Sequence, residues 1–405
     1  MAVGPDTLPT LHPVAGFRLG TASAGIKKPG RKDIVVMEVA EGSTVAGVFT
    51  TNAFCAAPVT LSKQHLAKAP SRYLMVNTGN ANAGTGTQGM VDAQSSCQAL
   101  AELTGLSAEN ILPFSTGVIG EKLPVEKIIA ALPEALSALD ANGWEQAASG
   151  IMTTDTRPKA ASLQFEWQGT KVTLTGVSKG AGMIKPNMAT MLGYVATDAA
   201  VDAPLLQKLL RETADKSFNR ITIDSDTSTN DSCMLVATGA SGVRVSEANP
   251  ELLDLFKAEL QKLMLQLAHA IVRDGEGATK FVTVQVEAAA SIDEALDTAY
   301  AVAHSPLVKT ALFASDPNWG RILAVVGRVG LKALVLDQLQ IYLNDVCIVR
   351  DGGRANDYTE AAGQAVMNQE EITIRIVLNR GEICETVWTT DLSHDYVSIN
   401  ADYRS

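Results

Sequence analysis

Short apolar runs separated by turn residues characterise the N-terminal part of the chain. Each run is rich in Val, Ile, Phe or Tyr and is bounded by Gly, Asn or Pro, a pattern typical of β-strands. These runs predict strands over residues 33–40, 43–50 and 73–79. A further apolar run is predicted to end as a strand at Thr116 and Gly117.

Other segments have a helical spacing, with apolar positions recurring every three or four residues. The longest of them, 250–273, carries its apolar residues on one stripe and is followed by Asp274-Gly275, which is expected to end the helix. Helices are predicted over 93–103, 125–138, 204–215, 250–273 and 293–302.

The middle of the chain alternates between further strands and turns. "WQGTKVTLTGVSKG" predicts a hairpin with Gln168-Gly169 at its turn, and 219–226 is predicted to pair as a strand with 233–239. Strands and helices mix without strict βαβ alternation, so we expect a layered α/β fold with mixed or antiparallel sheets and no doubly wound sheet. The remaining strands are predicted over 190–199, 280–290, 334–336, 341–343 and 371–378.

Composition narrows the class of protein. With 405 residues the chain is expected to form two domains or large lobes, and 46% hydrophobic and 19% charged residues are ordinary for a globular protein. The net charge of −11 argues against nucleic-acid binding. The five cysteines form no C-x-x-C pair, and neither a signal peptide nor a bilayer-spanning run is apparent, so we expect a cytoplasmic protein with no membrane association.

Metal and hydrolase signatures are missing. The sequence has no G-x-S-x-G motif and no His or Cys pairs at metal-ligand spacing. "DSDTSTND" (224–231) resembles a calcium loop but lacks its central glycine and closing glutamate, so we interpret it as a polar turn between two strands. We therefore predict no metal site.

The glycine-rich stretch "NTGNANAGTGTQG" (77–89) lies between a predicted strand and a predicted helix. It matches neither the Walker pattern nor G-x-G-x-x-G. An anion-binding nest at the helix start and tight turn packing both remain open for it.

Two segments carry candidate catalytic groups. Thr116-Gly117 combines a hydroxyl with a glycine that lets the backbone expose an amide, which are the parts of an oxyanion hole, although Ser-Thr-Gly turns are common. Thr190 follows Lys179 and a Gly-rich approach, and its alternative interpretation is a threonine that opens a strand. If the peptide bond before Thr190 were cut, the new α-amine, with an unperturbed pKa of about 8, would be able to act as its general base.

"KGAGMIKPNMATML" resembles the self-cleavage segment of the bifunctional glutamate N-acetyltransferase/ornithine acetyltransferase (ArgJ) family. The resemblance extends over essentially the whole chain. It implies transfer of an acetyl group from N2-acetyl-L-ornithine to L-glutamate in cyclic arginine biosynthesis. The other matching motifs, in order, are "NTGNANAGTG", "STGVIGE", "MTTDT", "DSDTSTND", "RDGEGATKF", "DPNWGR" and "INADYRS".

The resemblance also implies an architecture and a maturation step. The fold would be an α/β sandwich similar to self-processing aminopeptidases of the DmpA type. The chain would cut itself between Ala189 and Thr190 into an α chain, 1–189, and a β chain, 190–405, and the two would assemble as an α2β2 heterotetramer.

Roles for individual residues follow from the same resemblance. Thr190 would be the nucleophile, and Thr116 and Gly117 the oxyanion-hole pair. Lys179 suits a substrate carboxylate and Glu276 the ornithine ammonium. The positions that match substrate contacts are Thr153, Lys179, Thr190, Glu276, Asn400 and Ser405.

Two alternative functions remain open, as does the use of a second acetyl donor. A self-processed aminopeptidase or amidohydrolase would use water in place of glutamate as the acceptor. A non-catalytic metabolite-binding protein would use the glycine-rich loops alone. No cofactor is expected, and acetyl-CoA stays open as a second acetyl donor.

Overall fold

This computed structural model describes residues 2–185 and 191–402. The chain divides into two compact units, which are described separately. The sandwich unit comprises Thr7–Asn219 and Asp226–Ile271, and the C-terminal unit comprises Met1–Asp6, Arg220–Ser225 and Val272–Ser405.

The first sheet of the sandwich unit has four strands in the order β1-β2-β4-β5. Its neighbours are antiparallel except β4 and β5, which run parallel. One face packs against three helices through a buried apolar cluster that includes Ile34, Met75 and Leu100. The strands are β1 (Phe17–Ala22), β2 (Ile34–Val39), β4 (Tyr73–Asn80) and β5 (Ile111–Val118), and the helices are α1 (Ala57–Lys68), α2 (Gly86–Thr104) and α3 (Val125–Ser137).

The second sheet has five strands in the order β3-β10-β8-β7-β6. β8 and β10 are parallel, and the other pairs are antiparallel. The predicted hairpin is confirmed: Gln168 and Gly169 both have positive φ, 48° and 79°, as a two-residue type I′ turn requires. The strands are β3 (Thr44–Phe49), β6 (Lys159–Trp167), β7 (Thr170–Lys179), β8 (Leu192–Thr197) and β10 (Ser232–Ala237), beside the short pair β9 (Ala200–Val201) and β11 (Arg244–Val245).

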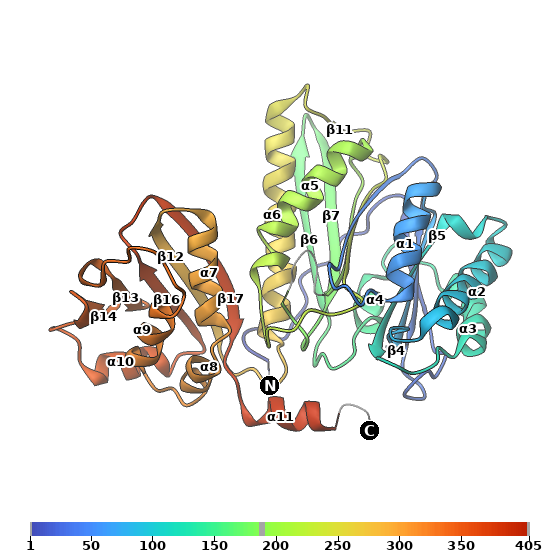
Figure 1. The fold of residues 1–405 in the computed structure, drawn as a ribbon. Coiled ribbons are helices and arrows are strands. Elements are labelled where there is room, and N and C mark those ends of the chain that lie inside the picture. Colours follow the sequence, from blue (N-terminus) through green and yellow to red (C-terminus); the bar gives the residue numbers. More distant parts are fainter. Residues whose placement is uncertain (1, 186–190, 403–405) are drawn as a thin grey trace. The chain divides into compact units, whose positions relative to one another are not determined.

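The two sheets share one apolar core, to which β1, β2, β4 and β5 contribute from one side and β7, β8 and β10 from the other. Within it, Phe114 of β5 meets Tyr194 of β8 edge to face, with ring centroids 5.3 Å apart. On the outer face of the second sheet, Phe256 packs on Phe165 of β6. The unit is thus a helix–sheet–sheet–helix sandwich (Figure 1), which confirms the predicted layered α/β fold. Its remaining helices are α4 (Trp144–Gly150), α5 (Ala203–Asp215) and α6 (Pro250–Arg273).

Local sequence signals account for the helices of the sandwich unit. α6 has the predicted bounds, and its buried stripe includes Phe256, Leu260 and Leu267. α5 begins after Asp202, whose side chain accepts a hydrogen bond from the Leu205 amide. These helices therefore form where an N-terminal cap or an apolar stripe specifies them.

The C-terminal unit is built on a mixed sheet of six strands in the order β15-β14-β13-β16-β12-β17. Side chains cap its helices: Ser291, Ser305, Asn318 and Thr359 each accept a hydrogen bond from an amide in the first turn. The strands are β12 (Phe281–Ala289), β13 (Gln340–Leu343), β14 (Val346–Arg350), β15 (Gly353–Arg354), β16 (Glu371–Val377) and β17 (Ile383–Thr390), and the helices are α7 (Ile292–Ala303), α8 (Pro306–Phe313), α9 (Trp319–Gly327), α10 (Glu360–Met367) and α11 (His394–Ala401).

Two predicted strands are wrong. Residues 219–226 contain the end of a 3₁₀ turn, Phe218–Arg220, and a single bridge from Ile221 to Trp388. β10 pairs instead with β3 and β8. Residues 334–336 form no strand: Val335 and Leu336 are exposed, and Leu334 packs partly buried against the apolar core of the C-terminal unit. Within the described part of the chain, no helix is long and apolar enough to cross a bilayer.

Candidate active site

The end of β5 places Thr116 and Gly117 beside the end of β4. Gly117 has a φ of 136°, and a Cβ atom there would lie 2.3 Å from the Gly79 carbonyl carbon and 2.5 Å from the Asn80 nitrogen. The backbone leaves no room for a side chain, so glycine is required. The register also shifts at Asn80, and such irregularities commonly redirect backbone groups near active sites.

Asparagine side chains fix the glycine-rich stretch 77–89 that follows β4. Asn80 Oδ1 accepts a hydrogen bond of 2.8 Å from the Asn82 amide, and Asn80 Nδ2 donates to the carbonyl of Lys122 at 3.1 Å. Asn82 Nδ2 donates to the Gly89 carbonyl at 2.8 Å. These contacts show the turn-packing role, one of the two predicted alternatives, and the anion nest stays a prediction.

The segment "DSDTSTND" ends next to the same strands. Asn230 Nδ2 donates to the carbonyls of Ala81 and Ser115, at 2.6 and 2.9 Å, and so joins the residue after β4 and the strand β5 to the segment that leads into β10. The segment was interpreted as a turn between two strands, but only its C-terminal side leads into a strand, β10. Within the described residues, no group of three or more His, Cys, Asp and Glu side chains is arranged to hold a metal ion.

Asp231 carries a buried carboxyl group directly before β10. Burial raises its pKa well above the usual range, against the opposing effects of a hydrogen bond from Ser228 and the charge of Lys179. Its Oδ2 atom has no hydrogen-bond partner within the described part of the chain.

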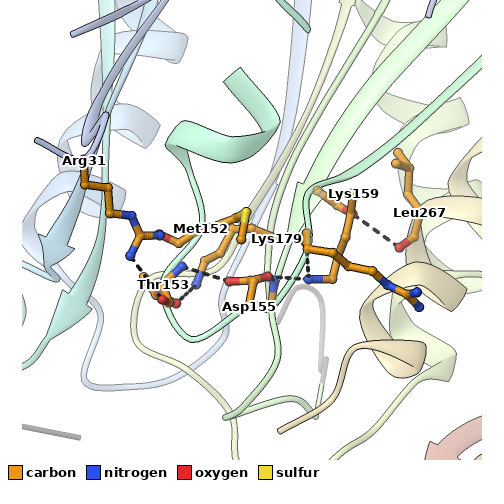
Figure 2. A network of polar contacts seen from close by, with 10 residues as sticks. Arg31, Met152, Thr153, Asp155, Lys159, Lys179 and Leu267 are labelled. Atoms are coloured by element: carbon orange, nitrogen blue, oxygen red, sulfur yellow. Dashed lines mark hydrogen bonds and ion pairs between the residues drawn. The ribbon is translucent and has the colours of Figure 1, made fainter. Parts of the chain in front are cut away.

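Thr153 and Lys179, both predicted substrate contacts, lie together (Figure 2). Lys179, the last residue of β7, donates from Nζ to Thr153 Oγ1 at 3.2 Å. Asp155 Oδ2 accepts from the Thr153 amide at 2.9 Å. On the other side, Arg31 donates to the carbonyls of Met152 and Thr153, at 2.5 and 3.3 Å. The position of Thr153 is therefore fixed through its amide, its carbonyl and its hydroxyl.

Asp155 carries the charge that organises this group. Its Oδ1 atom accepts from Lys159 Nζ at 2.5 Å and from the Gly180 amide at 2.8 Å. The side chains of Asp155 and Lys159 are 0% and 1% exposed. Burial raises the pKa of Asp155, but Lys159, Lys179 and the hydrogen bonds outweigh it and hold this pKa below its usual range. Asp155 is therefore an ionised carboxylate in the sandwich interior.

Glu276 and Asn400 form a second polar pair, within the C-terminal unit. Asn400 Nδ2 donates to Glu276 Oε2 at 2.7 Å and to the Tyr396 carbonyl at 3.0 Å. Gly277, with a φ of 68°, packs so closely that a Cβ atom would lie 2.4 Å from Ser393 Oγ and 2.7 Å from the Tyr396 amide. The glycine thus lets the turn that carries Glu276 contact the start of α11.

The structure brings the predicted residues together as pairs: Thr116 with Gly117, Thr153 with Lys179, and Glu276 with Asn400. Ala189, Thr190 and Ser405 lie outside the described residues.

Sequence reasoning missed Asp155, Lys159 and Arg31. Asp155 stands inside "MTTDT" and Lys159 follows four positions later, but only the fold shows that the pair is buried. Arg31, 121 positions before Met152, left no local signal.

Comparison with known proteins gives one consistent result. The ArgJ family model matches residues 18–405. The arginine biosynthesis bifunctional protein ArgJ of Pseudomonas fluorescens (strain Pf0-1) is 63% identical over 406 residues, covering 100% of both chains. Its counterpart from Methylococcus capsulatus is 56% identical over 395 residues, 98% of this chain and 97% of the relative.

Among solved structures, the Bacillus halodurans ArgJ protein is 35% identical, with a TM-score of 0.49, and covers 51% of this chain and 97% of that chain. Motifs from both compact units fall within the matched range. The chain is therefore a member of the ArgJ family.

Proposed function

We propose that this protein transfers an acetyl group from N2-acetyl-L-ornithine to L-glutamate in the cyclic route of arginine biosynthesis. The observation that carries this proposal is the full-length identity of 63% with a relative named for bifunctional ArgJ activity. The pairs described above supply the polar groups that such a reaction needs.

The nucleophile is the Thr190 hydroxyl, set free for catalysis by self-cleavage of the Ala189–Thr190 bond. The hydroxyl attacks the carbonyl before it in an N-to-O acyl shift, and water then hydrolyses the resulting ester. The products are an α chain, 1–189, and a β chain, 190–405, whose new α-amine stands beside the hydroxyl. β8 begins at Leu192, two residues after Thr190, so only Met191 separates the nucleophile from a buried strand in the sequence.

Acetyl transfer then proceeds in two steps, acetylation of Thr190 and transfer of the acetyl group to glutamate. The Thr190 α-amine takes the hydroxyl proton as the oxygen attacks the acetyl carbonyl of N-acetylornithine. The tetrahedral intermediate collapses, the amine of ornithine leaves with that proton, and an acetyl ester remains on Thr190. The amine of glutamate attacks this ester, yields N-acetylglutamate and returns a proton to the Thr190 oxygen.

Thr116 and Gly117 stabilise the oxyanion in both steps. The Thr116 hydroxyl and the Gly117 amide are the donors, and each is worth roughly 3 kcal/mol in such sites. The position of Gly117 is fixed by the backbone of Gly79 and Asn80, so the amide needs little reorganisation when charge develops.

Substrate recognition uses groups of opposite charge. The Lys179 ammonium, held against Thr153, binds the α-carboxylate that both substrates carry. Glu276, oriented by Asn400, binds the side-chain ammonium of ornithine. Ser405 is the remaining proposed contact.

We further propose a cytoplasmic α2β2 heterotetramer that needs no bound cofactor. Acetyl-CoA as a second donor would make the enzyme bifunctional, as the names of the relatives imply for those proteins. The rival function, an aminopeptidase or amidohydrolase, differs in accepting water.

The test is acetyl transfer by purified full-length enzyme, with N-acetylornithine or acetyl-CoA as donor, in the presence and absence of glutamate. We expect N-acetylglutamate to form from N-acetylornithine, and little donor to be consumed without glutamate. Equal donor consumption with and without glutamate would identify a hydrolase. Thr190→Ala is expected to give one uncut 42.7 kDa chain with no transfer.

A further inference from the structure

Asp155 is a buried carboxylate that touches both segments of the proposed carboxylate-binding site. One of these segments is the bend 152–155, which carries Thr153, and the other is the end of β7, which carries Lys179. They are 26 positions apart in the chain, and their side chains meet in the bond from Lys179 Nζ to Thr153 Oγ1.

Each oxygen of the carboxylate holds one of these segments. Oδ2 accepts from the Thr153 amide at 2.9 Å, and Oδ1 accepts from the Gly180 amide at 2.8 Å. Gly180 follows Lys179 directly, so the two bonds fix the backbone on either side of the Thr153–Lys179 contact. An amide side chain has one oxygen and is unable to reproduce both bonds.

Lys159 has a different role in the same cluster. Its ammonium donates to Asp155 Oδ1 at 2.5 Å. The exposed fraction of each of these two side chains is at most 1%. The lysine neutralises the carboxylate in the interior, and its ammonium also donates to the Arg157 carbonyl at 3.4 Å. Removing one partner of a buried ion pair leaves an uncompensated charge, whereas removing both is often nearly neutral for stability.

We propose that Asp155 is a positioning residue, which ties the bend at Thr153 to the end of β7 and so holds the Lys179 ammonium where it receives the substrate α-carboxylate. This inference rests on the proposed function. Substrate affinity would then depend on the two hydrogen bonds that Asp155 accepts from backbone amides, although Asp155 itself does not contact substrate.

The experiment compares Asp155→Asn, Lys159→Met and the double variant with the wild type, all as the full chain. For each protein, the thermal midpoint, the fraction of chain cut before Thr190, and kcat and KM for both substrates are measured. Asp155→Asn is expected to lower the midpoint and to raise both KM values about 10- to 100-fold. The double variant is expected to recover the midpoint and to keep the raised KM values.

A matched control removes a side-chain hydrogen-bond acceptor near the other end of β7. Asp198 Oδ1 accepts from the Thr173 amide of β7 at 2.9 Å, so Asp198→Ala removes a buried acceptor of a β7 amide away from Thr153. We expect it to lower the midpoint without raising KM. If Asp155→Asn does not fold, Lys159→Met, which keeps both amide bonds, should retain a KM near that of the wild type.

Three results would overturn the inference: recovery of KM together with the midpoint in the double variant, a tenfold rise of KM in Lys159→Met, or an equal rise in Asp198→Ala. The proposed function fails separately, because its failure would appear as a wild-type enzyme that transfers no acetyl group to glutamate.

Discussion

Asn400 and Glu276, 124 positions apart in the chain, are joined by a hydrogen bond of 2.7 Å from Nδ2 to Oε2. The Asn400 amide also donates to the Tyr396 carbonyl within α11, so its orientation is set by its own helix. The side chain of Glu276 is therefore oriented by a neutral donor, the amide of Asn400.

Glu276→Gln is expected to separate the two substrates. The loss of the negative charge should raise KM for N-acetylornithine about tenfold, because its side-chain ammonium loses an ionic partner. KM for glutamate should stay the same or fall, because the repulsion of its side-chain carboxylate is removed. Steady-state kinetics with each substrate varied in turn provide the measurement. Glu382→Gln, at an exposed position, is the control, and a parallel rise of both KM values would contradict this role.

Gly117→Ala is expected to lower kcat by roughly two to three orders of magnitude, because the Cβ atom would displace the strand end that presents the amide. Gly120→Ala tests the effect of positive φ alone, since Gly120 has a φ of 83° and no atom within 4 Å of the added carbon. We expect Gly120→Ala to cost about 1 kcal/mol of stability and to leave kcat unchanged. Circular dichroism melting and acetyl transfer measured on both variants decide the matter. A Gly117→Ala enzyme with normal kcat would exclude the oxyanion role.

Lys309 gives a stability that depends on pH. Its Nζ donates to the hydroxyls of Thr389 and Thr390, and burial lowers its pKa to about 8, against the opposing charges of Asp391 and Asp224. An unfolded lysine has a pKa of about 10.4, so between about pH 8 and 10.4 the unfolded state binds more protons and this group makes stability rise with pH. Below pH 8 its penalty is constant.

Lys309→Met should therefore change the difference in unfolding free energy from the wild type by up to roughly 3 kcal/mol between pH 7.5 and 10.4, in favour of the wild type at the higher pH. Urea unfolding at both pH values measures this difference, in which other titrating groups cancel. Lys171→Met, at an exposed lysine, should show no such change. A difference independent of pH in Lys309→Met would contradict the lowered pKa.

Substitutions of Trp144 measure how much packing at the centre of the sandwich contributes to stability. The side chain is fully buried and stacks on Phe17 with ring centroids 5.2 Å apart, and its indole Nε1 has no partner within the described residues. We expect Trp144→Ala to cost about 3–5 kcal/mol of stability. Trp144→Phe should cost much less, because it removes an unsatisfied donor while retaining a ring. Chemical denaturation of both variants gives the comparison, and equal losses would indicate that the indole nitrogen has a partner.

Local signals in the sequence were sufficient where an element is specified by its own residues. The α6 stripe and the Gln168-Gly169 turn are examples, because periodicity and positive φ act within a few residues. The sequence was misleading at 219–226, where the alternation of "RITID" fits a strand, but the neighbouring β10 takes its partners from β3 and β8. A strand needs a partner, and the partner is decided by tertiary packing.

The candidate site divides in the same way. The residues proposed to contact substrate lie within motifs that are visible in the sequence. The structure places Thr153 against Lys179 and Glu276 against Asn400. Asp155 was missed because its importance comes from burial and from contacts with backbone amides, which depend on how β7 meets the preceding bend. The steric requirement at Gly117 likewise depends on the backbone of β4, nearly forty residues earlier.

The strand order of the second sheet has a consequence for the mature enzyme. β3, β6 and β7 precede the proposed scission point, whereas β8 and β10 follow it, and the seams between the two groups run along β7–β8 and β3–β10. The two polypeptides would share one sheet, so that they could separate only if the hydrogen bonds of both strand pairs were broken. An affinity tag on either one should then recover its companion in a one-to-one ratio, and separately produced halves should fail to reconstitute an enzyme by simple mixing.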